Sequence, residues 1–298
     1  MILTHVLGST WAIEGNQLMG LYKLDDRRCI LIDSGMLPER EELARLLARE
    51  GLTPVGVLST HIHLDHSINN GWLRDTYGAL TAAPANELSL CRSVPALKAY
   101  LYCCSPGVLE QYLGQMVSPV DCPIPHQEGT FSFCGVDFHI VPTPGHSPGH
   151  LCVITPDHVC CVGDAVLSEP LLSQAKLPYN FHIAGMLDSA RRLRTLDCPR
   201  YLLCHHGVFD DLHPLIDATC ALSHRKGDEL CALIPRPMTY AEVWQAAIDH
   251  LGLYTSNPFK AAMIERNLRS FLDWLVDQGR LNWYAERGML YYAPNPAP

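Results

Sequence analysis

The chain has 298 residues, of which 48% are hydrophobic and 18% charged, and its formal net charge is −9. This composition is typical of a globular protein with a sizeable core, and the length fits two domains or one large domain with an appendage. The acidic balance disfavours broad binding to nucleic acids or anionic membranes, because contacts with phosphate groups need Lys and Arg; a local basic cleft would still fit it.

The ends and the cysteines of the sequence point to a cytoplasmic protein. Residues 1–10 lack the basic stretch and apolar run of a signal peptide, and no window reaches the roughly 18 apolar residues of a membrane helix. None of the 13 cysteines is spaced as Cys-x-x-Cys, so we expect reduced, mostly buried thiols.

The N-terminal 215 residues alternate short apolar segments with helical ones. Strands are predicted at 1–3, 11–13, 29–32 and 55–59, and an amphipathic helix at 38–50. The segment 84–118 is predicted to be helical in parts. A hairpin is expected at 130–141 with its turn at Cys134-Gly135, then a strand pair at 151–154 and 159–162, a helix at 185–196 and a strand at 201–204. Polar clusters follow several strand ends, as in the active sites of layered α/β folds.

The remaining residues, 216–298, read as a separate, mainly helical domain. Thr239 and Glu242 form a capping box for a helix that runs to about residue 250, and a longer helix is predicted over 258–278. Two apolar segments around Arg287-Gly288 predict a hairpin, so the region is expected to be winged-helix-like. Residues 220–298 contain eight Lys or Arg and eight Asp or Glu, so the whole net charge lies in residues 1–219.

The strongest local signal is a cluster of metal-binding residue types directly after the strand at 55–59. His61 and His63 are two positions apart, so an extended chain directs both side chains to one side, toward one metal. Asp65 and His66 follow and can serve a second metal. Imidazole nitrogen and carboxylate oxygen suit Zn, Fe, Mn or Co.

At this point the sequence resembles the metallo-β-lactamase superfamily, over roughly residues 1–210. Four segments carry the resemblance in order and spacing: THIHLDH at 60–66, TPGHSPGH at 143–150, VGD at 162–164 and LCHHG at 203–207. The early turn IDSG at 32–35 also matches. The resemblance implies an αββα sandwich of the α/β class, formed by residues 1–215.

The resemblance also implies a ligand set for two metal ions. His61, His63 and His146 would bind the first metal, Asp65, His66 and His206 the second, and Asp164 both. His205 stands where the family usually has Gly, so His206 is the expected ligand and His205 the alternative, or an additional side chain facing the site. His150 and Asp33 are candidates for orienting ligands by hydrogen bonds.

These roles predict a hydrolase that uses a metal-bridging hydroxide, with Asp65 orienting the proton of that nucleophile. The metals are expected to be two divalent ions, first of all Zn²⁺, with Fe or Mn as alternatives. True β-lactamases of the superfamily tend to have Cys where this chain has Asp164, so the expected substrate is a small thioester, lactone or other ester. A nuclease or nucleic-acid-binding protein and a mononuclear iron enzyme resembling the persulfide dioxygenases are the alternatives.

The sequence says less about the residues that contact the substrate and about partners. The segment 176–182 contains Tyr179 and His182, which suit either a substrate-contacting loop or an ordinary connection. For partners we expect a small-molecule substrate and no membrane. The balanced charge of the C-terminal domain favours packing against the active site or homodimerisation over nucleic-acid binding.

Overall fold

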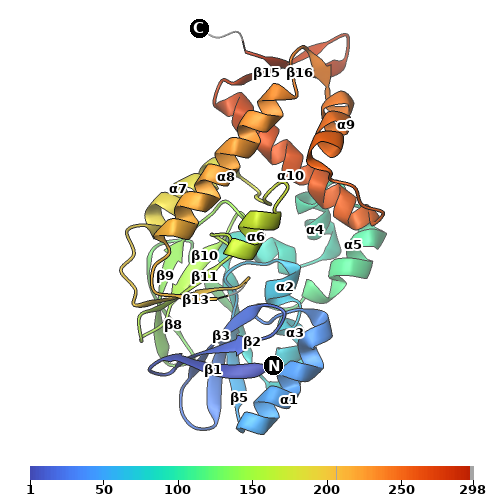
Figure 1. Ribbon diagram of the computed structural model, residues 1–298. Coiled ribbons are helices and arrows are strands. Elements are labelled where there is room, and N and C mark those ends of the chain that lie inside the picture. Colours follow the sequence, from blue (N-terminus) through green and yellow to red (C-terminus); the bar gives the residue numbers. More distant parts are fainter. Residues whose placement is uncertain (206, 296–298) are drawn as a thin grey trace.

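The N-terminal part of the chain builds a seven-stranded β-sheet, shown in blue and cyan in the computed structural model of Figure 1, which describes residues 1–205 and 207–295. Its strands lie in chain order: β1 (Ile2–Leu7), β2 (Thr10–Glu14), β3 (Leu18–Lys23), β4 (Arg28–Ile32), β5 (Thr53–Leu58), β6 (Leu80–Pro84) and β7 (Cys122–Ile124). The strands from β4 to β7 are parallel. Their carboxyl ends therefore meet at one edge, where β4 leads into Asp33 and β5 into the 60–66 segment.

A second sheet of six strands follows. Its order is β13 (Val208–Phe209), β12 (Arg200–Leu203), β11 (Val159–Gly163), β10 (Leu151–Ile154), β9 (Val136–Pro142) and β8 (Gly129–Phe133). The hairpin predicted at 130–141 is confirmed as β8 and β9, with Cys134 (φ 51°) and Gly135 (φ 81°) forming its turn. β11 and β12 are parallel, so Asp164 and His205 follow their carboxyl ends at the same edge.

The two sheets pack face to face, and helices cover their outer faces. Side chains from both sheets, among them Ile30, Leu58 and Phe138, fill the space between them. The outer face of the first sheet is covered by α1 (Arg40–Glu50) and α3 (Asn70–Tyr77), and that of the second by α7 (Ile183–Leu193) and the start of α8 (His213–Ala232). The expected αββα sandwich is confirmed.

Shorter helices connect these layers near the carboxyl ends of the strands. They are α2 (Leu64–Ser67), α4 (Val94–Tyr100), α5 (Pro106–Leu113) and α6 (Glu169–Gln174), with the 3₁₀ helices η1 (Leu37–Glu39), η2 (Ala85–Cys91) and η3 (Gly114–Met116). The segment 84–118, predicted to be helical in parts, contains η2, α4, α5 and η3. None of the described helices is long and apolar enough to cross a lipid bilayer.

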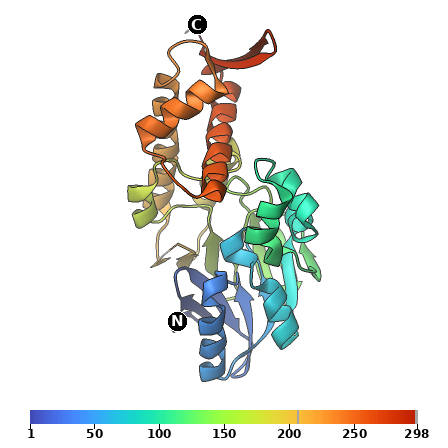
Figure 2. The same cartoon turned by 90° about the vertical axis from the view of Figure 1, so that its right-hand side faces the viewer.

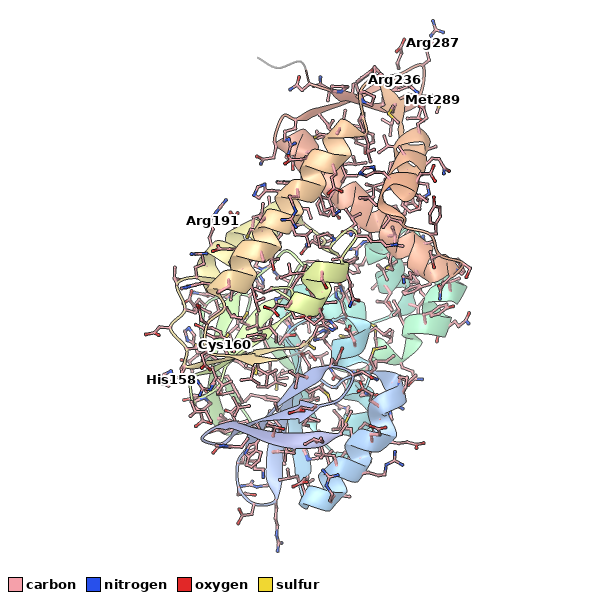
Figure 3. The ribbon with its side chains drawn as sticks, viewed as in Figure 1. His158, Cys160, Arg191, Arg236, Arg287 and Met289 are labelled. Carbon is pink, nitrogen blue, oxygen red and sulfur yellow. The ribbon has the colours of Figure 1, made fainter. Side chains whose placement is uncertain are left out.

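The C-terminal residues form a helical unit at the end of the molecule opposite α1, as Figures 1 and 2 show. After α8 come β14 (Met238–Thr239), α9 (Tyr240–Leu251), α10 (Pro258–Asp277), β15 (Leu281–Glu286) and β16 (Met289–Pro294), with the strand order β14-β16-β15. The capping box of Thr239 and Glu242 starts α9 as predicted. Arg287 and Met289 lie at the far tip of this unit (Figure 3).

The predicted boundary between residues 215 and 216 falls inside α8. Leu215 and Ile216 pack with the second sheet, whereas Leu230 belongs to the core of the C-terminal unit together with Leu268 and Phe271. The two parts are therefore joined by a continuous helix that contributes to both cores. The winged-helix-like character of the C-terminal unit stays a prediction.

Candidate metal centre

Three imidazoles converge at the carboxyl end of β5. His61 Nε2 lies 3.0 Å from His63 Nδ1, which lies 2.9 Å from His146 Nε2. His61 is completely buried, and His63 precedes the first turn of α2. His146 follows Gly145, which has φ 145° and approaches α7 so closely that a Cβ atom would lie 2.3 Å from the backbone nitrogen of Met186. A glycine is thus required where the chain turns His146 toward the other two rings.

A second group lies beside the first. His66 Nε2 is 3.4 Å from Asp164 Oδ2 and 3.6 Å from Asp65 Oδ2. His205 Nε2 is 3.3 Å from Asp164 Oδ2 and 3.5 Å from Asp65 Oδ2. Two imidazoles and two carboxylates therefore face one another across a few ångströms.

Asp164 connects the two groups. Its Oδ2 atom is 3.3 Å from His146 Nε2 in the first group, about as far as from His66 and His205 in the second. The carboxylate stands at the end of β11, after Gly163, whose φ of 57° permits the turn. This is the position required of a ligand shared by two metals.

Hydrogen bonds fix the outward-facing atoms of these side chains. Asp33 Oδ2 lies 2.8 Å from His66 Nδ1 and also accepts a hydrogen bond from the Thr60 hydroxyl. His150 Nε2 accepts a hydrogen bond from the backbone N–H of Asp164 at 3.0 Å. The structure thus places Asp33 and His150 next to the site, each holding a ligand by a contact that leaves the ligand's inner atom free.

Glu87 in η2 joins the two ligand-bearing loops, a role that the sequence did not predict. It is completely buried, and its two carboxylate oxygens accept hydrogen bonds from the backbone N–H of Ile62, at 2.5 Å, and of Gly149, at 2.7 Å. Ile62 stands between His61 and His63, and Gly149 precedes His150. The carboxylate therefore sets the spacing between the loop of the first motif and that of the second.

The electrostatics of the first group and of Asp164 favour metal ligation. Burial, reinforced by the neighbouring imidazoles, holds the pKa of His61 and of His63 well below the usual value, and burial also lowers the pKa of His146. These rings are therefore neutral near pH 7, and a neutral imidazole is the form that binds a metal. Burial opposes the charge of Asp164, but His66, His205 and His146 outweigh it and hold the pKa of this carboxyl well below its usual range.

The residues present fit a pair of divalent cations. Ligand atoms on a tetrahedral Zn²⁺ lie about 3.3 Å apart, because the bonds are about 2.0–2.1 Å long, and the nitrogens of the first group are spaced similarly. His66 Nε2 and Asp164 Oδ1 are buried without a hydrogen-bond partner among the described residues. Unpartnered buried polar atoms that face carboxylates and imidazoles are what a metal would satisfy.

The last predicted ligand is one of two adjacent histidines. His206, the expected ligand, lies outside the described residues. His205, the alternative, is the second residue after β12 and contacts Asp164 and Asp65, with 30% of its side chain exposed. Cys204 is also near, but its Sγ lies 3.9 Å from His66 Nδ1, the nitrogen already held by Asp33.

Metal content of two single variants will distinguish the two histidines. We expect His205→Ala to lose about one of two metal equivalents, because its Nε2 atom is among the four polar atoms of the second group. Inductively coupled plasma mass spectrometry of His205→Ala and His206→Ala, dialysed in parallel, measures this. Loss of metal from His206→Ala with full retention by His205→Ala would show that the motif alignment is right and the contacts of His205 are incidental.

Of the two remaining residues predicted as substrate contacts, Tyr179 lies at the site and His182 does not. Tyr179 lies beside the first group, and its backbone oxygen is 3.3 Å from His146 Nδ1. His182 does not join the site: it is exposed and caps α7, accepting a hydrogen bond from the backbone N–H of Gly185. A histidine before a helix has a local use as a cap, which explains its position without substrate contact.

Two further residues near the site were not foreseen. The Tyr100 hydroxyl is 3.4 Å from His63 Nε2, the nitrogen turned away from the first group. Arg266 of α10 is 5% exposed, donates a hydrogen bond to the Tyr179 hydroxyl and stacks its guanidinium 4.1 Å from the centre of the Tyr100 ring. The C-terminal unit thus reaches the surroundings of the metal ligands through a buried cation.

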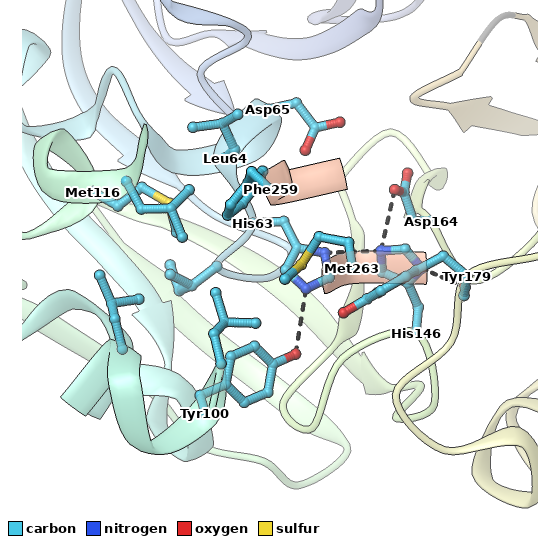
Figure 4. Close-up of a pocket in the computed structure, with 14 residues that line it drawn as sticks. His63, Leu64, Asp65, Tyr100, Met116, His146, Asp164, Tyr179, Phe259 and Met263 are labelled. Carbon is cyan, nitrogen blue, oxygen red and sulfur yellow. Dashed lines mark hydrogen bonds and ion pairs between the residues drawn. The ribbon is translucent and has the colours of Figure 1, made fainter. Parts of the chain in front are cut away.

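A pocket of about 250 Å³ opens beside the two groups, and Figure 4 shows it. His63, Asp65, His146 and Asp164 form one side. Its lining is completed by Ile62, Leu64, Leu97, Tyr100, Leu101, Leu113, Met116, Tyr179, Phe259 and Met263. The site is therefore open to a small molecule, and part of its wall comes from α10.

Comparison with known proteins agrees with this geometry. Residues 12–205 match the family description "Metallo-beta-lactamase superfamily", which is about two thirds of the chain. The chain belongs to the metallo-β-lactamase superfamily. It is accordingly a metal-dependent hydrolase, and the family membership predicted from the sequence is confirmed.

Sequence relatives in the superfamily include several hydroxyacylglutathione hydrolases. The one of Xanthomonas oryzae pv. oryzae is 25% identical over 280 residues, covering 89% of this chain and 92% of the relative. That of Rhizobium meliloti is 28% identical over 120 residues, covering 40% and 36%. That of Buchnera aphidicola is 27% identical and covers 60% and 57%. This chain thus spans only 36% of the length of the Rhizobium meliloti protein and 57% of that of the Buchnera aphidicola protein.

Solved structures of the superfamily share the fold over nearly the whole chain. A β-lactamase domain protein from Burkholderia ambifaria superposes with a TM-score of 0.71 at 19% identity and covers 98% of this chain and 94% of its own. A metallo-β-lactamase family protein from Thermus thermophilus superposes with a TM-score of 0.69 at 20% identity, covering 93% of both. At these identities the likeness establishes the fold alone, and it includes the C-terminal unit.

Proposed function

We propose that this chain hydrolyses a small thioester, lactone or other ester, using two divalent metal ions, with zinc as the first candidate. The observation that carries the proposal is the position of Asp164, whose Oδ2 atom lies 3.3 Å from His146 of the first group and 3.4 Å from His66 of the second. One carboxylate oxygen between two separate sets of ligands supports a dinuclear centre over a mononuclear one.

Each ligand would have a defined part in such a centre. His61, His63 and His146 would hold one ion, Asp65, His66 and His205 or His206 the other, and Asp164 both. When bound, the ions lower the pKa of water toward neutrality and polarise the carbonyl of the substrate. Asp65 borders the pocket with its Oδ2 atom near His66 and His205, so it can also hold a proton of the attacking water.

Side chains outside the two ligand groups would position the substrate. Tyr100 and Tyr179 carry the polar atoms of the pocket wall that do not belong to the two ligand groups, so they are candidates to orient the carbonyl. Their hydroxyls are held by contacts with His63 and Arg266, respectively. No nucleophilic Ser or Cys is required, because water serves as the nucleophile.

The named relatives support the ester-type substrates among the alternatives. Several are hydroxyacylglutathione hydrolases, whose name describes hydrolysis of an acyl derivative of the thiol glutathione, a thioester. The balanced charge of residues 220–298, eight basic against eight acidic residues, does not favour nucleic-acid binding. We propose instead that the C-terminal unit closes one side of the active site, in a monomer or a homodimer, and that the protein acts in the cytoplasm on a small molecule.

A substrate panel on metal-defined protein tests the proposal. Protein stripped with a chelator and reloaded with Zn²⁺, Mn²⁺ or Fe²⁺ should hydrolyse a thioester, a lactone or a simple ester, and the stripped protein should not. The phosphodiester and β-lactam arms should stay near background. Phosphodiester cleavage that falls steeply with salt would favour the nuclease alternative. Oxygen uptake with a persulfide at one iron per chain would favour the dioxygenase.

A further inference from the structure

The pocket beside the metal centre is apolar over most of its wall. Six aliphatic or aromatic side chains dominate it: Leu97, Leu101, Leu113, Met116, Phe259 and Met263. Among the described residues that line it, the only carboxylates and imidazoles are those of the two ligand groups, and none is Lys or Arg. An anionic or strongly polar substituent would therefore lose its hydration here without gaining a charged partner.

The nearest cation is turned away from this space. Arg266 lies behind Tyr100 and Tyr179, with its guanidinium stacked on one ring and bonded to the hydroxyl of the other. It is not among the residues that line the pocket. The guanidinium group of Arg266 thus contacts the two tyrosines of the pocket wall, and it does not face a carboxylate bound in the pocket.

The wall joins two parts of the fold. Leu97 and Leu101 come from α4 and the residue after it, Leu113 ends α5, and Phe259 and Met263 stand one turn apart on α10. Phe259 stacks on Tyr112 of α5, with ring centres 4.8 Å apart. This contact fixes the start of α10 against α5, so the pocket has a defined shape and size.

From this lining we propose that the substrate carries an apolar substituent next to its scissile bond, an alkyl or aryl group of roughly six to eight heavy atoms, seated between α4, α5 and α10. The size follows from the cavity of about 250 Å³ and a space of about 30 Å³ for each water-sized group. This inference rests on the proposed ester hydrolysis and specifies its substrate class. The ligand residues His63 and Asp164 border the same pocket, which places the scissile bond at its metal-facing end.

Chain-length series test the proposal. One series of esters lengthens the acyl group from two to ten carbons with a fixed leaving group, and another lengthens the alcohol with a fixed acetyl group. In at least one series, kcat/KM should rise by up to about fourfold per methylene, the gain expected from burying that group, and stop rising near six to eight carbons. Rates that do not depend on length in both series would overturn the proposal while leaving ester hydrolysis intact.

Variants of Met263 test whether the pocket causes the dependence of kcat/KM on chain length. Met263→Trp fills it and should move the optimum to shorter chains, whereas Met263→Ala enlarges it and should move the optimum to longer ones. Misfolding does not shift an optimum in two opposite directions. Lys260→Trp, on the exposed side of the same helix, is the matched control and should leave the length profile unchanged. Identical profiles for both Met263 variants and the wild type would place the substituent elsewhere.

A binding measurement covers the case in which no ester is turned over. N-methyl alkanamides have the shape of the substrate but resist hydrolysis, and their affinity can be titrated by NMR. Affinity should increase from the four-carbon to the eight-carbon amide by about an order of magnitude or more, and Met263→Trp should abolish the increase. Equal affinity along the series would overturn the pocket proposal whatever the activity of the protein.

Discussion

Replacing Asp164 by alanine is expected to lower kcat/KM for any ester substrate by at least about 1,000-fold, because metal ions contribute several kcal/mol of transition-state stabilisation. Asp164 contacts both ligand groups, through His146 in the first and His66 and His205 in the second. Its removal should weaken both metal sites together. Steady-state kinetics and metal analysis on the same sample measure the two effects.

The same variant has a stability signature. Metal binds the folded chain more tightly than the unfolded one, so added Zn²⁺ should raise the melting temperature of the wild type more than that of Asp164→Ala. Asp188→Ala, at a carboxylate on α7 that is 70% exposed, is the matched control and should behave as the wild type. Full metal content and unchanged kinetics in Asp164→Ala would disprove the assignment of the bridging ligand.

Replacing Glu87 by alanine is expected to destabilise the protein by about 2–4 kcal/mol, since the backbone N–H groups of Ile62 and Gly149 would lose their acceptor in a buried site. The loops bearing His61, His63 and His146 would lose their common anchor. We therefore expect a loss of about 10- to 100-fold in metal affinity, as for other residues that orient metal ligands. Chemical denaturation of the metal-free protein and competition with a zinc chelator measure the two quantities.

Glu87→Gln distinguishes the contribution of the two hydrogen bonds from that of the packing of the side chain. The amide keeps one acceptor oxygen but turns an NH₂ group toward the second backbone N–H, so its effects should lie between those of the wild type and Glu87→Ala. Glu110→Ala, at an exposed position of α5, is the control for loss of a glutamate in the same region. Wild-type metal affinity in Glu87→Ala would show that the two loops keep their spacing without the carboxylate.

The elements that the sequence predicted well are those with a local pattern. Alternating apolar residues around Cys134-Gly135 indicated the hairpin of β8 and β9, and Thr239 with Glu242 indicated the start of α9, because turn and cap geometry depend on neighbouring residues. β3 and β6 escaped notice. Their short apolar segments lack alternation, since both faces of a central strand are buried and only pairing with neighbours distinguishes them from other buried segments.

The residues of the site also divide into those that a local sequence pattern predicted and those that it did not. His61, His63, Asp65 and His66 were recognisable because they are closely spaced ligands after one strand. Glu87 and Arg266 were not, because a lone Glu or Arg in a helical segment normally lies on the surface, and only the tertiary fold buries these two. His182 shows the converse: of the two interpretations left open for the segment 176–182, its use as a helix cap fits the ordinary connection.

The wall of the pocket is formed jointly by the β-sandwich domain and the C-terminal unit. The metal ligands stand on loops of the β-sandwich, whereas Phe259 and Met263 belong to α10, which is anchored in the C-terminal core by Leu268 and Phe271. Phe259 and Met263 also pack against the buried cluster that contains Ile62, which stands between two of the metal ligands. The start of α10 therefore links the shape of the pocket to the position of a ligand loop, and a redesign of specificity at residues 259–263 would have to preserve that packing.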